Sequence, residues 1–168
     1  MATFKMAEWE FNAPKWCRFS NCGLYKLPEG EGEKDYHCHD CDEYLIVIEG
    51  KGELLLEDRV YKIISGDCVC IPIYCKHQIL KALEDFTLVW IYDELKGEKR
   101  KGHIPAEEGN KPTLPAKLVK IGHWMEEKPE WSRLTDLGIL NFPKGKIEMD
   151  YHYHDCCEYY FLAKCSDS

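Results

Sequence analysis

Histidine and glutamate residues stand in this chain at spacings that suit a metal site. His37 and His39 are two residues apart, Glu43 follows four residues later, and His77 lies thirty-four residues beyond Glu43. Alternate residues of an extended strand face the same way, so His37 and His39 point to one side. Three imidazoles and a carboxylate suit a divalent first-row metal such as Mn, Fe, Ni, Co or Zn, and they leave coordination positions open for a substrate. We therefore expect one such metal ion at four residues, His37, His39, Glu43 and His77.

The same cluster recurs 115 residues further along, within a longer internal repeat. The segment EKDYHCHDCDEY at 33–44 corresponds to EMDYHYHDCCEY at 148–159, and an ungapped comparison of 5–53 with 120–168 gives 17 identities in 49 positions. Chance would give about three at ordinary composition. Four of the seven histidines lie in these two segments and a fifth is His77, a concentration that disfavours the alternative that they are merely solvated. The second copy offers a second metal cluster, His152, His154 and Glu158.

The repeat divides the chain into unequal parts. We expect a complete domain at 1–95, a linker at 96–118 and a partial second copy at 119–168. The second copy is interpreted as incomplete because it has no counterpart of 66–77 and ends opposite Glu53. The interval between the copies is polar, is punctuated by Gly and Pro, and has no apolar period, as is usual for linkers and long surface loops.

The elements that must position these residues are predicted to be short strands. Apolar and β-branched runs alternate with turns containing Gly, Pro or Asp, at spacings of about eight to twelve residues, which is typical of an antiparallel sandwich or barrel. A helix is expected only near the linker or around 119–125. The predicted fold class is therefore all-β. The expected strands are 24–27, 36–39, 44–48, 53–57, 59–64, 68–71, 77–83 and 86–92.

Composition limits the partners and the compartment. Lys and Arg number 22 and Asp and Glu number 30, so the net charge is −8. This balance argues against nucleic acid or an anionic membrane, because both bind clustered cations. No apolar run approaches the roughly 20 residues of a membrane span, and the N-terminus lacks the apolar stretch of a signal peptide, so we expect a cytoplasmic protein. The ten cysteines are then expected to be reduced thiols.

A cysteine zinc module is the alternative for part of this thiol content. Cys38 and Cys41 have the two-residue interval of zinc ligands. Such a module would normally use a second CxxC pair, and the sequence has none, since Cys68 and Cys70 are too close together. We therefore prefer the histidine cluster as the metal site.

With both motifs in order, the chain resembles the cupin superfamily. The resemblance covers roughly 20–92 and implies an antiparallel double-sheet, jelly-roll-like barrel with the metal inside near one mouth. The repeated first motif is similar to a bicupin whose second cupin repeat is incomplete. Two departures concern the rim of the pocket, because Tyr74 stands where the family usually has Gly and no Asn follows His77 at the usual place. The matching motif positions are Gly32, His37, His39, Glu43 and Gly50, then Gly66, Pro72 and His77.

Further residues are candidates for the pocket or its surroundings. Asp40 could orient a histidine ligand through a carboxylate contact. Tyr44 could donate to a metal-bound oxyanion, although strand parity favours a place outside the barrel. Gln78 adjoins His77 and is a weaker candidate. Arg18 recurs as Arg133, and we interpret both arginines as structural in preference to contacts with an anionic substrate.

Three function classes remain open, because a fold of this kind hosts many chemistries. The favoured class is a metal-dependent isomerase or epimerase acting on a small carbohydrate-derived, keto or enediol substrate. The alternatives are a non-catalytic sensor of a metal or small ligand, and an Fe(II) dioxygenase. The partial repeat is expected to form strands around 131–140 and 151–162 whose apolar surface would need a partner, so we also expect a homodimer.

Overall fold

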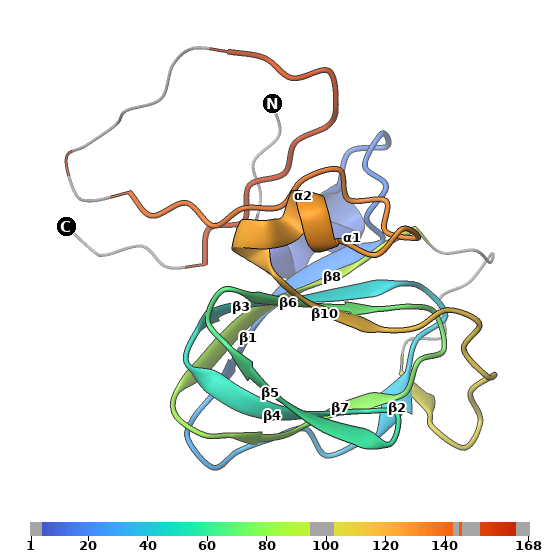
Figure 1. The fold of residues 1–168 in the computed structure, drawn as a ribbon. Helices are drawn as coiled ribbons and strands as arrows, with labels where there is room; N and C mark the ends of the chain where they lie inside the picture. Colours follow the sequence, from blue (N-terminus) through green and yellow to red (C-terminus); the bar gives the residue numbers. More distant parts are fainter. Residues whose placement is uncertain (1–4, 95–102, 143–144, 146–151, 164–168) are drawn as a thin grey trace.

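The computed structural model describes residues 5–94, 103–142, 145 and 152–163, and these form two facing antiparallel sheets. The first sheet has the order β1-β8-β3-β6-β10 and the second the order β5-β4-β7-β2-β9. Figure 1 shows the two sheets curving into one barrel. The prediction of an all-β, double-sheet fold is confirmed. The strands are β1 (Asn21–Leu27), β2 (His37–Cys38), β3 (Glu43–Glu49), β4 (Lys51–Leu56), β5 (Arg59–Ile64), β6 (Asp67–Ile71), β7 (His77–Ala82), β8 (Phe86–Tyr92), β9 (Ile104–Pro105) and β10 (Lys117–Lys120).

The strands follow from alternating side chains and from glycine turns. In β4 every second residue is buried, as expected for a strand with one face toward a core. The connection from β3 to β4 passes through Gly50, whose φ of +82° favours glycine. A Cβ at this position would also collide with the backbone oxygen of Asp85. The turn between β5 and β6 likewise uses Gly66 with φ +87°.

The barrel interior is filled by apolar side chains from both sheets. They are aliphatic or aromatic, with Cys75 the one sulfur-bearing member among the described residues. Packing of this kind removes apolar surface from water, which is the main favourable term in folding. The buried members are Leu27, Leu45, Val47, Leu54, Leu56, Ile63, Val69, Ile71, Cys75, Ile79, Ala82, Phe86 and Leu88.

A second apolar layer lies on the outer face of the first sheet. Strands β3, β6 and β8 present Tyr44, Cys70 and Ile91 to this side, where chain segments from both ends of the sequence cover them. Figure 1 shows α1 and α2 above this sheet. Because both faces of these strands are buried, their sequences are nearly continuous in apolar residues.

The helical segments that cover the outer layer have the same local structure in both copies of the internal repeat. A 3-10 helix η1 (Met6–Glu8) and helix α1 (Trp9–Asn12) precede β1. Their counterparts, η2 (Ile121–His123) and α2 (Trp124–Glu127), begin 115 residues later, because 121 − 6 and 124 − 9 both equal 115. The helix expected around 119–125 is therefore present. The expectation of no other helix was wrong for 6–12, because a four-residue helix is too short to create a periodic pattern.

Part of the interval expected to be a linker belongs to the barrel. Strand β9 pairs with β2, and β10 pairs with β6, so residues 104–105 and 117–118 of this interval supply backbone to the two sheets. Asp67 at the start of β6 holds β10 in place through an ion pair with Lys120, and its second oxygen accepts from the Ile64 amide at 2.9 Å. The division into domains stays a prediction, and 95–102 lies outside the described residues.

Where the second copy is described beyond α2, it does not repeat the strands of the first. Within 128–142 and 152–163 the described chain has no strand, yet side chains such as Trp131, Leu137 and Phe161 pack on the outer layer of the barrel. The expectation of strands around 131–140 and 151–162 was therefore wrong for the described part. A strand needs a neighbouring strand as partner for its backbone hydrogen bonds. In the described structure neither sheet pairs with these segments, which contact the barrel through their side chains. Among the described residues, no helix is long and apolar enough to cross a membrane.

Candidate metal centre

Four predicted ligands meet at one end of the barrel. His37 begins β2 and pairs in register with His77, the first residue of β7. Glu43 begins β3 in the other sheet, where it pairs with Ile71 and Tyr92. The two sheets therefore bring donors of distant sequence positions to a common point. One ligand nitrogen from each of His37, His39 and His77 lies within 4.8 Å of the other two.

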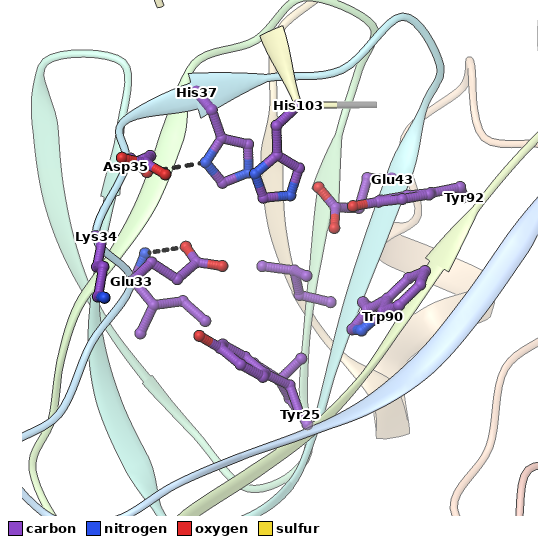
Figure 2. A pocket seen from close by; sticks show the side chains of 12 residues that line it. Tyr25, Glu33, Lys34, Asp35, His37, Glu43, Trp90, Tyr92 and His103 are labelled. Atoms are coloured by element: carbon purple, nitrogen blue, oxygen red, sulfur yellow. Dashed lines mark hydrogen bonds between the residues drawn. The ribbon is translucent and has the colours of Figure 1, made fainter. Parts of the chain in front are cut away.

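Backbone carbonyls orient two of the imidazoles. Nδ1 of His37 lies 2.9 Å from the Asp35 carbonyl oxygen, a contact drawn in Figure 2. Nδ1 of His77 lies 3.0 Å from the Cys75 carbonyl oxygen. A carbonyl can only accept, so each Nδ1 carries the proton and each Nε2 keeps a lone pair when the ring is neutral. This is the usual way in which a protein prepares a histidine to bind metal.

The carboxylate of Glu43 lies among the imidazoles. Its Oε2 is 2.9 Å from Nε2 of His77 and 3.4 Å from Nε2 of His39. The exposed fractions of His37, His39, Glu43 and His77 are 2%, 3%, 3% and 2%, so water does little to solvate this charge. A carboxylate buried this deeply needs a positive partner, which can be a protonated histidine or a metal ion.

The pKa values follow from burial and from this cluster. Burial lowers the pKa of His37, and it lowers that of His39 to about 4 against the attraction of Glu43. For His77 burial also opposes the charged form, but the contacts with Glu43 prevail and raise its pKa. For Glu43 burial opposes ionisation, yet the histidines lower its pKa to about 2. At neutral pH the site therefore combines an ionised carboxylate with two imidazoles whose lowered pKa favours their neutral form.

The residues present fit a divalent first-row metal. The donors are mixed imidazole nitrogen and carboxylate oxygen, all are buried, and the nitrogens face a common centre. Cys38 and Cys41 are both buried, and no cysteine of the described chain joins a group of potential metal ligands. All nine described cysteines are free thiols. Occupation of the site by a metal stays a prediction.

A cavity of about 300 Å³ opens beside the cluster. Its walls mix three kinds of side chain, and Figure 2 shows the polar and aromatic members around the opening. Such a mixture of apolar surface and a few polar groups is typical of small-molecule sites. The lining residues are Leu45, Ile79 and Leu88, the aromatic residues Tyr25, Trp90 and Tyr92, and the polar residues Glu33, Lys34, Asp35, His37, Glu43 and His103.

Two of the earlier pocket candidates lie beside the cavity without lining it. The side-chain amide of Gln78 donates to the Glu33 backbone oxygen at 2.9 Å. Gln78 thus helps to position Glu33, which lines the cavity, without lining it itself. Asp40 is half-buried in the connection between β2 and β3 and is not among the residues that line the cavity.

Tyr44 does not reach the cavity. It lies in the outer layer, and its hydroxyl is 3.1 Å from the Ser132 hydroxyl. Successive residues of a strand point to opposite faces, so Tyr44 must point away when Glu43 points in. The suggestion that Tyr44 belongs to the pocket is therefore wrong, and Tyr44 lies outside the barrel, as strand parity favoured.

The second cluster lies on the surface. His152 and His154 approach each other with 3.1 Å between their Nε2 atoms, and Nε2 of His154 is 3.6 Å from Glu158 Oε1. The side chains of His154 and Glu158 are 44% and 43% exposed, in contrast to the buried first cluster. A metal ion there would lack the enclosing barrel that the first cluster has, and its binding stays a prediction.

Three functional candidates emerge from the structure and not from the sequence motifs. Glu33 lines the cavity, and burial raises its pKa. The Tyr92 hydroxyl lies 3.2 Å from His39 Nε2, close to where a ligand of the histidines would sit. His103 stacks on the His37 ring with centroids 3.9 Å apart and 6° between the planes. One signal was available for Glu33, since it recurs as Glu148 in the repeat.

Comparisons with known proteins agree with this architecture. Residues 23–92 match the family described as the cupin domain. The uncharacterized protein y4oW from Sinorhizobium fredii is 37% identical over 70 residues, which are 42% of this chain and 32% of that protein. This match therefore spans about a third of the length of the relative.

Solved structures with a similar fold include several cupin proteins. Salicylate 1,2-dioxygenase from Pseudoaminobacter salicylatoxidans is 21% identical with a TM-score of 0.40, covering 43% of this chain and 19% of that one. Oxalate decarboxylase from B. subtilis is 18% identical with a TM-score of 0.41, covering 46% and 22%. A cupin superfamily protein from Desulfitobacterium hafniense is 17% identical with a TM-score of 0.43, covering 49% and 72%.

Proposed function

Because the chain belongs to the cupin superfamily through its residues 23–92, we propose that its buried donor cluster holds one divalent first-row metal and that the protein is a metal-dependent enzyme. The substrate would be a small molecule with a keto or enediol group, and the reaction an isomerisation or epimerisation. The observation that carries this proposal is the ionised Glu43 buried among three imidazoles beside a cavity. The proposed ligands are His37, His39, Glu43 and His77.

The chemistry needs an electrophile, a hydrogen-bond donor and a group that moves a proton. A bound divalent metal would supply Lewis acidity toward a carbonyl oxygen. The Tyr92 hydroxyl, next to His39 Nε2, is placed to donate to a substrate oxygen at the cluster. His103 lines the cavity and stacks on His37, so its imidazole can accept a proton from a carbon next to that carbonyl. These roles together describe proton transfer at an activated carbonyl.

The cavity also explains how the reaction would be protected from water. Leu45, Ile79 and Leu88 form its apolar part, and all three are nearly inaccessible to solvent. The ring of His103 lies over His37 at the opening. Apolar side chains on one part of the wall strengthen electrostatic contacts to the substrate there and limit side reactions of an enediol.

The experiment combines metal analysis with a substrate panel. Protein purified without oxygen should carry close to one equivalent of a divalent metal, and aldoses or ketoses incubated with it in deuterium oxide should show exchange at the carbon next to the carbonyl by NMR. Less than about half an equivalent of any metal after reconstitution would contradict the proposed centre. Oxygen consumption with an aromatic or keto-acid substrate would instead indicate a dioxygenase, and saturable binding without turnover would indicate a sensor.

A further inference from the structure

Glu33 is held rigidly in the cavity wall by the neighbouring strand β7. Its amide donates to the Ile79 carbonyl oxygen at 2.8 Å, and its Oε2 accepts from the Ile79 amide at 2.7 Å. The chain approaches β7 this closely because the preceding residue is Gly32, where a Cβ would collide with the Leu80 backbone oxygen. One carboxylate oxygen is therefore committed to the backbone. Figure 2 shows the other oxygen pointing into the cavity.

Two aromatic residues of the opposite sheet complete this part of the wall. Tyr25 of β1 and Trp90 of β8 line the same cavity as Glu33. Burial and the nearby carboxylates of Glu33 and Glu31 raise the pKa of Tyr25, so its hydroxyl keeps its proton and can donate. Figure 2 shows this hydroxyl on the side that faces Glu33. A carboxylate acceptor, a phenol donor and an indole face are the groups that bind hydroxyls and C–H faces of a polyhydroxy compound.

The charges of the cavity are distributed unequally. Away from the histidines, the charged lining residues are Glu33, Asp35 and the exposed Lys34, and no arginine of the described chain lines the cavity. A phosphate or carboxylate next to Glu33 would face a fixed negative charge in a partly dry site, without a bidentate cation to hold it. An anionic group is therefore disfavoured at this end, and such repulsion is a common source of specificity.

From this arrangement we infer that Glu33, Tyr25 and Trp90 form a subsite for the uncharged, hydroxyl-bearing end of the substrate. The subsite selects free sugars and polyols with a carbonyl at the other end, and it rejects their phosphorylated forms. This inference rests on the proposed function, because the carbonyl end must lie at the donor cluster for the hydroxyl end to reach Glu33. It adds the substrate class that the donor cluster alone does not define.

The test compares two ligands that differ in one charged group. The Mn²⁺-loaded protein is titrated calorimetrically with D-xylulose and with D-xylulose 5-phosphate. We expect the wild-type protein to bind the free sugar at least about tenfold more tightly, from the like-charge repulsion alone. Glu33→Gln should weaken binding of the free sugar severalfold and reduce this preference to less than about threefold. Glu31→Gln changes an exposed carboxylate two residues away and should keep the wild-type ratio.

Every result of this comparison decides the inference. Tyr25→Phe removes a hydroxyl without removing the ring, and a severalfold loss for the free sugar would support the subsite independently of Glu33. The inference is overturned if the phosphate binds as tightly as the free sugar, if Glu33→Gln and Glu31→Gln behave alike, or if neither sugar binds. Metal content measured on the same samples separates this outcome from failure of the proposed function. A protein that cannot be loaded with metal contradicts the function, whereas a loaded protein with the wrong charge preference contradicts only the subsite.

Discussion

Arg18 donates a hydrogen bond to the backbone oxygen of Arg133, its own counterpart in the internal repeat, over 3.5 Å. The two guanidinium groups also form ion pairs with two consecutive carboxylates that follow β8. Arg18 pairs with the buried Asp93 at 3.1 Å, and Arg133 pairs with Glu94 at 3.2 Å. Equivalent residues of the two copies therefore meet each other, as they do near the axis of a two-fold interface.

Aromatic residues also form equivalent contacts between the two copies. The Tyr44 ring lies 6.4 Å from Trp131, and the Tyr159 ring lies 6.0 Å from Trp16. Since 159 − 44 and 131 − 16 both equal 115, each tyrosine packs on the tryptophan of the other copy. The two copies thus exchange equivalent contacts within one chain, even though the described residues 128–142 and 152–163 of the second copy contain no strand.

Replacement of the two tryptophans should separate their contributions. Trp131 covers the fully buried Tyr44 and donates to the Pro115 carbonyl oxygen at 3.0 Å, whereas Trp16 is 59% exposed. We expect Trp131→Ala to lower the free energy of unfolding by about 1–3 kcal/mol and Trp16→Ala by less than about 1 kcal/mol, because the loss depends on burial. Urea unfolding measures both values. Equal losses would contradict this account of the interface.

Metal binding should distinguish two adjacent residues of β2. His37 faces the donor cluster, while the Cys38 side chain is fully buried and lies against Gly109 instead. We expect His37→Ala to lose most of the bound metal and any activity, and Cys38→Ser to retain both with modestly reduced stability. Elemental analysis after reconstitution gives the metal content. Equal loss from both variants would point to a cysteine-containing site.

The pH dependence of metal affinity should reflect one histidine. The pKa of His77 is raised above 6.5, so below that raised value the ring carries a proton that the metal must displace. The pKa of His37 is lowered, that of His39 is lowered to about 4 and that of Glu43 to about 2, so protons compete with the metal less at these three groups than at His77. Affinity should therefore rise by up to about tenfold per unit from pH 5.5 and level off above the pKa of His77.

Competition with a chelator of known affinity measures this profile. A slope near one proton is expected below the pKa of His77, and a slope near zero is expected at pH 8. A steeper slope corresponding to two or three protons would mean that His37 and His39 are also protonated in the metal-free protein. His77→Ala removes the titrating group, and its residual affinity should lose most of the dependence on pH.

The strands and the histidine cluster could be predicted because their signals are local. Alternating residues, glycine turns and the spacing of His37, His39 and Glu43 all act within a few positions of the chain. The sequence does not show whether Trp90 or Val89 of β8 points into the barrel. Both faces of this strand are apolar, so alternation alone does not distinguish the inner face from the outer one. The structure places Trp90 in the cavity and Val89 in the outer layer.

The remaining site residues depend on contacts distant in sequence. Glu33 reaches the cavity through its pairing with Ile79, which no pattern around position 33 reveals. His103 comes from an interval without apolar period, and pairing of β9 with β2 brings it over His37. Likewise the sequence of β10 does not indicate that it pairs with β6. Asp67 and Lys120 are distant in sequence and meet only when the two strands align. Local sequence reasoning cannot supply tertiary pairings of this kind.

The second copy leaves an apolar face in water that its first-copy counterpart buries. Leu140, Phe142, Tyr160 and Leu162 are 58%, 55%, 57% and 78% exposed. Subtracting 115 gives four positions that lie in or against the core inside the first barrel, Tyr25, Leu27, Leu45 and Val47. The alternate residues, including Tyr159 and Phe161, already pack on the outer layer. The exposed residues are therefore the inward-facing side of the repeat.

We expect this face to associate with the same face of a second chain, giving a two-fold dimer. Two copies would bury eight large apolar side chains that otherwise form a patch of the kind that marks interfaces. Light scattering should give about twice the 19.7 kDa chain mass. Leu162→Lys should shift the protein to monomer, because a charge would be buried without a partner. The control Leu80→Lys changes a 38% exposed leucine of β7 and should leave the dimer intact. A wild-type mass of one chain at micromolar concentration would refute the dimer.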